Sequence, residues 1–600
     1  MSKDLLRSSQ VITTFGPGAM VDLPDWSVII GGLDHWDENK RRKIIEHRLL
    51  PRLPDPSRGL ATPPLHDENP YSNERPGLEV FVFPTWFLTA EGQPSPGHAG
   101  RHRRRLVRFG EIDARKRTFE GKPVVPVRFV AACEAGHVED VDWKLFVHRG
   151  AKDCDHPLWL EESGASGDVK ETWVCCGCGD ERPLYDALGA HAKVLGPCRG
   201  RRPWLGPDAS EPCDLHKRLL VRTASNAYFP VLISVLSIPQ AAPSDLQRLV
   251  ETHWDDLHQV TSPADLANLL RFNSAVRNTF AGYDETDLLR AIQEMRDQPP
   301  SLRPDEFAIL KGHVSAPLEL ADPTALLATE PLDRGQWDPD YRFPQIEKVV
   351  LVHRLREVLA QIGFTRFEPV TSNPEGELDL GVRSQKLSNA PWPYPAIELY
   401  GEGIFLAFDE KRLRGWMANK TVRERSERLE AGFQQWRKRV PTGHHAFPGV
   451  AYVALHTLSH LLLAEIALDC GYPLAALRER IYALPDRDAF GVLVYTASSG
   501  SGGTLGGLVE AGKRIGDYLE RALERARLCS SDPICAEHDP SLEGVGNPLS
   551  GAACHGCVLV PESSCENRND FLDRALLVET LADKGVALFQ DFGGGSARRR

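Results

Sequence analysis

The sequence lacks any run of 18 uncharged apolar residues, so it predicts no transmembrane helix. Its first ten residues, MSKDLLRSSQ, lack the apolar stretch of a secretory signal peptide, and we therefore expect a cytoplasmic protein. The chain also lacks an excess of positive charge, because its formal net charge is −12. This charge excludes a generally basic nucleic-acid coat, and any contact with DNA or RNA must come from local basic patches.

Several catalytic motifs are also missing. The glycine-rich stretch 499–507, SGSGGTLGG, has no GK[ST] ending, so it is not an ATP-binding P-loop. No HxK is followed by an aspartate at the spacing that phospholipase D-type nucleases use. Between His456 and His460 the position that is glutamate in an HExxH zinc protease is Thr457, so we favour buried, hydrogen-bonded histidines over zinc ligands. The sequence therefore predicts a protein that is not an enzyme.

The chain has 600 residues, of which 42% are hydrophobic and 26% charged. This is enough for a large core, arranged either as three or four average domains or as one large multi-layered body with insertions. We predict a mixed α+β and α/β multidomain fold with a zinc-stapled insertion in the N-terminal half. The expected divisions are 1–130 (mixed α/β), 131–220 (Cys/His-rich, zinc-binding), 221–243 (a core strand), 244–310 (a helical insertion), 311–346 (a linker) and 347–600 (an α/β domain with a zinc site at 529–565).

Hydrophobic periodicity and turn residues predict the main elements. Strands are expected over 11–15, 78–83, 225–239 and 490–496, with a strand pair over 397–408. Helices are expected over 347–363, 420–438, 449–468 and 508–527, with a final helix near 568–584. Alternation of the two types from 345 to 530 indicates an α/β layer.

Thirteen cysteines in a cytoplasmic chain favour metal ligands over disulfides. Cys554 and Cys557 have the two-residue separation that places both sulfurs on one ion, and Cys529 and Cys535 form the natural second pair. Cys565 lies close enough to be an alternative ligand. Four thiolates favour Zn²⁺ in a closed structural site, and an iron–sulfur cluster is the minor alternative.

A second set of cysteines and histidines lies in the N-terminal half, and its spacing leaves the pairing open. Eight candidates are enough for two tetrahedral sites: Cys133, His137, His148, Cys154, Cys175, Cys178, Cys198 and Cys213. We predict one site from Cys175, Cys178, Cys198 and Cys213, with Cys176 as an alternative to Cys175. A second site would use Cys133, His137 and Cys154. The whole chain would then hold two to three zinc ions.

Short basic runs are the candidates for phosphate contact. They contain Arg101, Arg103, Arg104, Arg105, Lys411, Arg412, Arg414, Arg437 and Lys438. Trp416 and Trp436 lie beside two of these runs and could stack on bases. A solvated helix face, balanced by neighbouring glutamates, explains the same runs equally well.

A metal-dependent nuclease is the alternative function from the residues alone. Glu398, Asp409 and Lys411 have the residue types that bind Mg²⁺ and activate water in restriction-type nucleases. This spacing is common by chance, and a charged strand end is the simpler interpretation.

The C-terminal third resembles a known zinc-binding domain. The segments HTLSHLLL (456–463), GVLVYTASSGSGGTLGGLVEA (491–511) and the cysteine-bearing stretch 529–577 are similar to the DUF1998, or helicase-associated zinc-binding, domain. The resemblance implies that Cys529, Cys535, Cys554 and Cys557 bind zinc. The two pairs are further apart here than in the helicases, which keeps Cys565 as a rival.

The rest of the chain extends this resemblance to a stand-alone family. The stretches 10–36, 132–143, 198–206, 224–239 and 363–369 are similar to the DrmB family of the bacterial DISARM anti-phage system. The resemblance implies a subunit that pairs with a separate superfamily 2 helicase, DrmA, and engages foreign DNA. It supplies no catalytic residue.

Overall fold

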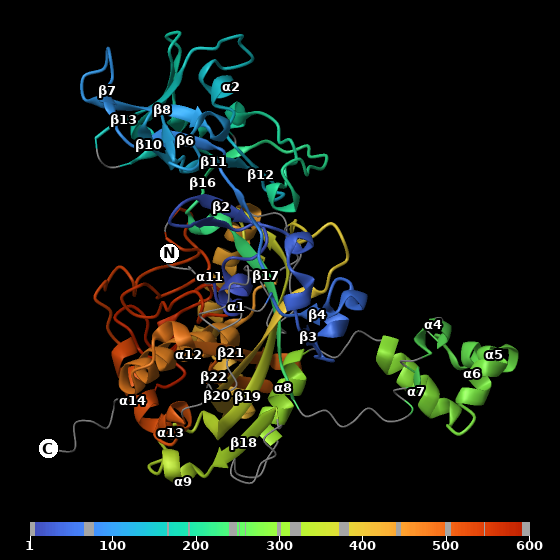
Figure 1. The fold of residues 1–600 in the computed structure, drawn as a ribbon. Coiled ribbons are helices and arrows are strands. Elements are labelled where there is room, and N and C mark those ends of the chain that lie inside the picture. The colour runs from blue at the N-terminus through green and yellow to red at the C-terminus, as the bar shows by residue number, and fades with distance from the viewer. Residues whose placement is uncertain are drawn as a thin grey trace.

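A computed structural model describes the chain (Figure 1). The described residues are 6–64, 77–164, 167–189, 192–238, 246, 249–250, 253–257, 260–296, 302–312, 326–370, 383–439, 446–497, 506–544 and 546–590. Most of the glycine-rich stretch 499–507 lies outside these residues.

A strongly curved antiparallel sheet forms the centre of the molecule. Its strand order is β17 (Phe229–Leu236), β19 (Ile346–Thr365), β20 (Tyr394–Phe408), β22 (Ala489–Thr496) and β21 (Leu477–Leu484). Strand β18 (Leu327–Leu332) also pairs with β19, and the short β3 (Lys43–Ile44) and β4 (Leu60–Ala61) join at β20. The interpretation of a mixed α and β fold is confirmed, but the pairings of the main strands are antiparallel rather than those of a wound α/β layer.

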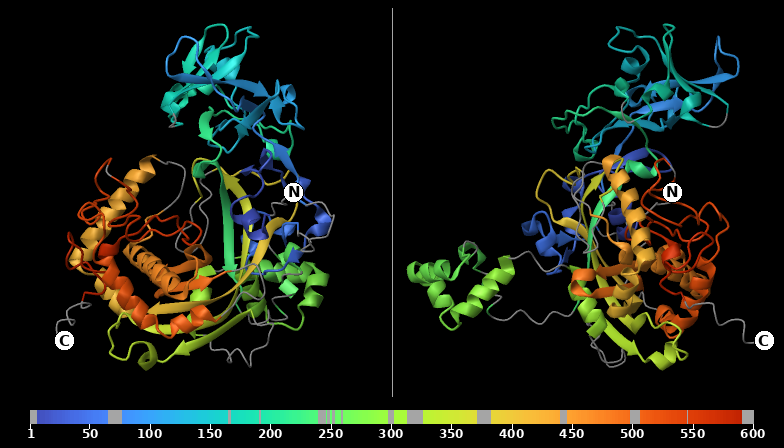
Figure 2. Two further views of the ribbon diagram at one scale, coloured as in Figure 1. Left: turned by 60° about the vertical axis from the view of Figure 1, so that its left-hand side comes forward. Right: turned by 180° about the vertical axis from the view of Figure 1, so that it is seen from behind.

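Helices cover one side of this sheet, and the N-terminal segment lies on the other side (Figure 2). The helices are α10 (Glu410–Met417), α11 (Lys420–Arg439), α12 (Val450–Cys470), α13 (Gly507–Gly512) and α14 (Ile515–Ala526). Helix α12 packs on β21, β22 and α14, and is apolar nearly all round. Its length and composition would allow it to cross a membrane, but 89% of its most apolar stretch is buried inside the protein. It is therefore the core helix of the C-terminal half.

The longest central strand, β19, corrects the predicted helix over 347–363. The segment contains apolar residues at helical spacing, but it also begins with the β-branched run Val349, Val350 and Val352, and its central residues are buried on both faces. A strand covered on both faces needs apolar residues at nearly every position, which hides the two-residue period. Pairing with β17 and β20 on its two edges decided the conformation.

Two further expectations for local structure were wrong. Residues 11–15 do not form a strand, because α1 (Ser8–Thr13) is a short helix whose Ile12 packs against Leu359 and Ile397 of the central sheet. In the described part of 568–584 the only helical turn is the 3-10 element Arg574–Leu576. Residues 568, 569 and 571 have positive φ angles, which a right-handed helix does not allow.

A second sheet forms the separate module at the top of Figure 1. Its order is β15 (Glu181–Pro183), β14 (Thr172–Cys176), β13 (Leu158–Ser163), β8 (Arg101–Arg108), β6 (Trp86–Thr89), β10 (Lys122–Pro126) and β9 (Thr118–Phe119), with β7 (Gln93–Pro94) on β8. The sheet thus joins strands from both sides of the boundary expected at residue 130, and β11 (Phe129–Ala132) runs across that boundary. Residues 86–183 therefore belong to one module and are not divided at residue 130.

A small sheet links this module to the centre of the molecule. Strand β11 pairs with β12 (Val138–Glu139) and β16 (Arg218–Val221). Close by, β1 (Met20–Asp22), β2 (Ser27–Ile30) and β5 (Val80–Val82) form a three-stranded sheet, and β5 lies within the strand expected over 78–83. The short helix α2 (Trp143–Val147) packs on β14 and β15.

The helical insertion stands apart from both sheets (Figures 1 and 2). It contains α4 (Trp254–Leu257), α5 (Pro263–Phe272), α6 (Ser274–Thr279) and α7 (Glu285–Arg296), which share a small core of their own. Helix α8 (Leu302–Gly312), expected in the same insertion, instead packs on the central sheet. There its buried Glu306 accepts a 2.7 Å hydrogen bond from Arg480 of β21. In the predicted linker 311–346, β18 and α9 (Arg334–Trp337) are regular elements.

Candidate metal centres

Four cysteine thiols meet near the C-terminal end of the described chain. They belong to Cys529, Cys535, Cys554 and Cys557, here called the four-cysteine group, and the sulfur atoms all lie within 4.8 Å of one another. The Sγ–Sγ distances are 3.4 Å for Cys529–Cys554, 3.8 Å for Cys535–Cys557 and 3.7 Å for Cys554–Cys557. These are the two sequence pairs expected to share one ion.

The distances in the four-cysteine group fit a zinc ion. Thiolates at about 2.3 Å from a tetrahedral zinc are about 3.8 Å apart, whereas the sulfurs of a disulfide are about 2.05 Å apart. The Cys557 thiol and the nearby Arg574 stabilise the anionic form of Cys535 against its burial, which lowers the pKa of Cys535 to about 6. The same hydrogen bond between the two cysteines raises the pKa of Cys557, so Cys535 is the member of this pair that first supplies the thiolate to which a metal binds.

The segment around the four-cysteine group has little regular structure of its own. Its residues are held by buried polar contacts: Arg574 donates to Asp532 and, at 2.8 Å, to the carbonyl of Ala526. Three of the four cysteines also belong to the main hydrophobic core of the C-terminal half. A metal at this position would replace the backbone hydrogen bonds that a helix or strand would supply.

The first N-terminal group, here called N1, is made of Cys133, His137, Cys198 and Cys213. The Nδ1 atom of His137 lies 3.3 Å from the sulfur of Cys133 and 3.6 Å from that of Cys198. The other ring nitrogen, Nε2, lies 2.7 Å from Glu211 Oε1. A carboxylate on the second nitrogen is the usual way to orient a metal-bound histidine.

The second N-terminal group, N2, is made of His148, Cys154, Cys176 and Cys178. The sulfurs of Cys154 and Cys176 are 3.5 Å apart, and Cys178 Sγ is 3.5 Å from His148 Nε2. His148 Nδ1 donates a 2.8 Å hydrogen bond to the Lys144 carbonyl, which leaves the lone pair of Nε2 for a metal. The backbone N–H of Asp180 and the ring of His148 lower the pKa of Cys178 to about 6.

The structure groups the N-terminal ligands differently from the predicted sets. Cys198 and Cys213 lie with Cys133 and His137, whereas Cys154 and Cys178 lie with His148 and Cys176. Cys175, expected as a ligand, is in neither group. The division of the ligands between N1 and N2 depends on how loops that are far apart in the sequence pack together, so the spacing of the residues along the chain could not predict it.

Strand geometry explains why Cys176 replaces Cys175. Both residues lie on β14, where successive side chains point to opposite faces of the sheet. Cys176 faces group N2, and Cys175 faces away, with its sulfur 4.0 Å from Glu181 Oε2. A strand predicted over Cys175 and Cys176 would have placed their side chains on opposite faces, and this signal could have distinguished the ligand from its neighbour.

Cys565, the rival ligand at the C-terminal end, is not part of the four-cysteine group. Its sulfur lies 3.1 Å from Nε2 of His456 instead. His456 and His460 are fully buried on α12, and their Nδ1 atoms lie 3.3 and 3.0 Å from the carbonyls of Phe571 and Val558. Burial opposes a charge on His460, but the carboxylate of Glu479 outweighs it and raises the pKa of His460 to about 9.

Most of the arginines of β8 already have partners within the protein. Arg104 forms an ion pair with Glu162, and Arg101 with Glu161 and Glu181. The guanidinium groups of Arg101 and Arg103 lie over the rings of Trp173 and Trp159, at 3.7 and 4.3 Å from the ring centroids. These arginines therefore stabilise the β8–β13–β14 sheet, and their role in binding DNA stays a prediction.

The basic residues of the C-terminal half lie on two adjacent helices. Lys411, Arg412, Arg437 and Lys438 are exposed on α10 and α11, whereas Arg414 forms ion pairs with Glu410 and Asp488. The expectation that Trp416 stacks on bases is wrong, because its ring is only 6% exposed and its Nε1 donates to the carbonyl of Val586. Trp436 is partly buried against the core.

The structure does not assemble the alternative nuclease site. Glu398 and Asp409 lie toward opposite ends of the extended β20, roughly 35 Å apart along the strand at about 3.3 Å per residue. Glu398 forms ion pairs with Arg42 and Arg356, and Asp409 caps α10 by accepting from the N–H of Arg412. Two carboxylates at this separation cannot share a metal ion.

Comparisons with known proteins show which family the chain resembles and which of these groups lies in a known zinc-binding domain. The family model described as the MrfA Zn-binding domain matches residues 458–558, which contain the whole four-cysteine group. DISARM protein DrmB from Bacillus paralicheniformis is 30% identical over 475 residues, which cover 78% of this chain and 82% of that protein. The chain belongs to the DrmB family.

This DrmB-family chain thus has a C-terminal zinc-binding domain, as the sequence predicted. A second family model, for a domain of unknown function (DUF8724), matches residues 7–229 and contains both N1 and N2. His456 and Cys565 lie outside both matched segments. Of these groups, the four-cysteine group is the one that lies wholly within the zinc-binding match, while N1 and N2 rest on the chemistry of their ligands.

Proposed function

We propose that this chain is a non-catalytic subunit of a DISARM-type anti-phage system, which pairs with a DrmA-like superfamily 2 helicase in the cytoplasm and helps it engage foreign DNA. The observation that supports this most is its similarity to DISARM protein DrmB along 78% of the chain. The metal groups agree with a structural role, because four protein ligands leave no coordination position for a reactive water.

We further propose that N1 and N2 each hold a structural zinc ion. Their ligands are a mixture of thiolate and imidazole, which is the usual zinc set, and the histidine of each group has a second hydrogen-bond partner. The ion of N2 would fix the shape of the module at the top of Figure 1, which projects from the central body, and the ion of N1 would fix the turn between β11 and β12 in the small sheet that links the two. A rigid projecting module is suited to contact a partner protein or DNA.

Co-purification with a DrmA-like superfamily 2 helicase tests the pairing. We expect a stable complex on size exclusion, and ATP hydrolysis by the helicase or the complex but not by the isolated chain. Turnover of ATP by the purified chain alone would contradict the proposed role. Absence of a complex, with both proteins folded, would contradict the pairing.

A protein-only adaptor is the second candidate, and one observation favours it. The arginines of β8 are largely occupied by Glu161, Glu162 and aromatic rings, which reduces the charge available to phosphates. The exposed candidates that remain are those of α10 and α11.

DNA binding measured against salt concentration distinguishes the two candidates. We expect the double variant Arg437→Glu/Lys438→Glu to weaken binding by the helicase complex and to reduce the salt dependence by about one unit per lost phosphate contact. Arg290→Glu, an exposed charge in the separate helical insertion, is the matched control. Equal binding by all three proteins would favour the adaptor that contacts protein only.

A further inference from the structure

A fourth group of potential ligands lies in the core, apart from the three groups described so far. It consists of His456 and His460 from α12, Glu479 from β21 and Cys565 from the C-terminal segment, all within 4.8 Å of one another. We propose that this group, here called the HHEC group, is a further structural metal site and that its ion is Zn²⁺. It would join the core helix, the edge strand of the central sheet and the segment that follows the four-cysteine group.

The hydrogen bonds of the two histidines point to a cation between them and Glu479. Each Nδ1 faces a backbone carbonyl, which can only accept, so each Nδ1 carries the hydrogen. Each Nε2 then presents a lone pair, and both Nε2 atoms face the same carboxylate oxygen, Glu479 Oε1, at 2.9 Å for His456 and 3.3 Å for His460. Three acceptors directed at one point require either a metal ion or two additional protons.

Cys565 adds a fourth donor in its thiolate form. Its sulfur accepts hydrogen bonds from the backbone N–H groups of Asn567 at 3.2 Å and Asn569 at 3.1 Å. The same arrangement is present in the four-cysteine group and in N1, where the sulfurs of Cys529 and Cys198 accept from the N–H two residues later. Backbone N–H groups stabilise a negatively charged sulfur, so Cys565 has the environment of a metal ligand.

The charges of the HHEC group also balance around a divalent ion. One carboxylate, one thiolate and two neutral imidazoles together with Zn²⁺ give no net charge, which a buried position requires. The set of one oxygen, one sulfur and two nitrogens is borderline in softness, as zinc prefers. Tetrahedral zinc would place the nitrogens about 3.4 Å from the oxygen and about 3.6 Å from the sulfur, so the present distances need to increase by only about 0.5 Å or less.

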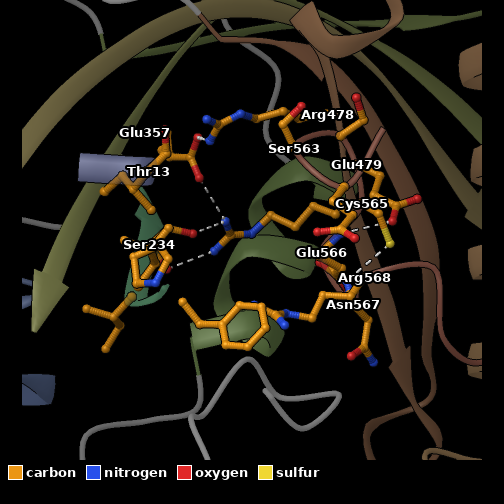
Figure 3. A pocket seen from close by; sticks show the side chains of 18 of the residues that line it. Thr13, Ser234, Glu357, Arg478, Glu479, Ser563, Cys565, Glu566, Asn567 and Arg568 are labelled. Carbon is orange, nitrogen blue, oxygen red and sulfur yellow. Dashed lines mark hydrogen bonds and ion pairs between the residues drawn. The ribbon is translucent and has the colours of Figure 1, made fainter. Parts of the chain in front are cut away.

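The surroundings of the group support a bound ion in two ways. Glu479 is oriented by the hydroxyl of Ser459 and by the N–H of Glu566, which donates to Oε1 at 3.1 Å. Glu479 and Cys565 also line a cavity of about 490 Å³, and Figure 3 shows the two side chains next to each other at its wall. The cavity provides a path for a metal to reach an otherwise buried site.

Zinc analysis of the full-length protein tests the proposal. We expect Cys565→Ala and His460→Gln each to lower the zinc content by one ion per chain while the other three groups stay loaded. Cys470→Ala is the matched control, because Cys470 lies in none of the four groups, and its zinc content should equal that of the unaltered protein. Unchanged zinc content in the soluble variants would overturn the proposal and leave two protonated histidines as the alternative.

The unaltered protein decides the question if the variants are insoluble. We expect four zinc ions per chain, and a zinc-edge X-ray absorption spectrum with more nitrogen and oxygen neighbours than the three cysteine-rich groups supply. Three zinc ions or fewer per chain, with the sulfur-rich average of those groups, would overturn the proposal.

Discussion

The N-terminal and C-terminal metal groups use similar ligands in very different surroundings. Cys133 and Cys198 of N1 share a small apolar cluster that contains one other buried residue, Ala135. The four-cysteine group instead adjoins the largest core of the molecule, and three of its cysteines are part of that core. Loss of a metal ion should therefore disturb the structure only locally in the N-terminal half, but should disturb the main hydrophobic core in the C-terminal half.

The largest expected effect is that of Cys557→Ser. Loss of zinc from the four-cysteine group removes a contribution that in small zinc domains is on the order of 10 kcal/mol, and here the main core lies directly beside it. We expect one zinc ion fewer per chain and mostly insoluble protein, measured by metal analysis and by the soluble fraction. Cys470→Ser is the control. If the Cys557→Ser protein melts at the same temperature as the unaltered one, the four-cysteine group does not stabilise the main core.

A smaller effect is expected from Arg425→Ala, which tests whether the C-terminal half depends on metal alone. Arg425 is 1% exposed and its Nε lies 2.7 Å from the buried carboxylate of Asp573. Removal of one partner leaves a buried charge unpaired, which costs about 3–5 kcal/mol. Denaturant unfolding of the zinc-loaded protein measures this loss. Arg423→Ala, an exposed arginine of the same helix, should have almost no effect.

The neighbouring cysteines Cys175 and Cys176 allow a matched test of group N2. Cys176→Ser should lose one zinc ion and make the N-terminal module sensitive to protease, while the C-terminal half unfolds at its usual temperature. Cys175→Ser should keep its zinc, because its side chain points to the other face of β14. The reverse result would show that the grouping around His148 is wrong.

The smallest effect is expected from Glu211→Gln in N1. The carboxylate orients His137 through a 2.7 Å contact, and loss of such a partner lowers metal affinity by about 10- to 100-fold. Competition with a zinc chelator measures the change, and the fold should be unaltered. Glu134→Gln, which pairs with Arg218 and not with a ligand, is the control. Equal zinc affinity in both variants would assign Glu211 no role in the site.

Much of the architecture could be predicted from local patterns. Helices α11 and α12, strand β22 and the helical character of the insertion lie where periodicity placed them. Strand β19 did not, because an element that is buried on both faces loses the alternation that would identify it. Hydrophobic periodicity also could not show that residues 568–584 do not form a helix. Asn569 has a positive φ angle, and its N–H donates to the sulfur of Cys565 instead of to a helical carbonyl.

The sequence by itself determined that metal binding is central to this protein, because the number of cysteines and the pair Cys554 and Cys557 favour it wherever thiols stay reduced. It also predicted the four-cysteine set, but Cys565 stayed a rival ligand until the structure placed it beside His456. Only the tertiary structure decided how the N-terminal ligands divide between N1 and N2, and that His456, His460, Glu479 and Cys565 meet. A tetrahedral site needs donors from several directions, and segments far apart in the sequence reach those directions only after the sheets and helices have packed.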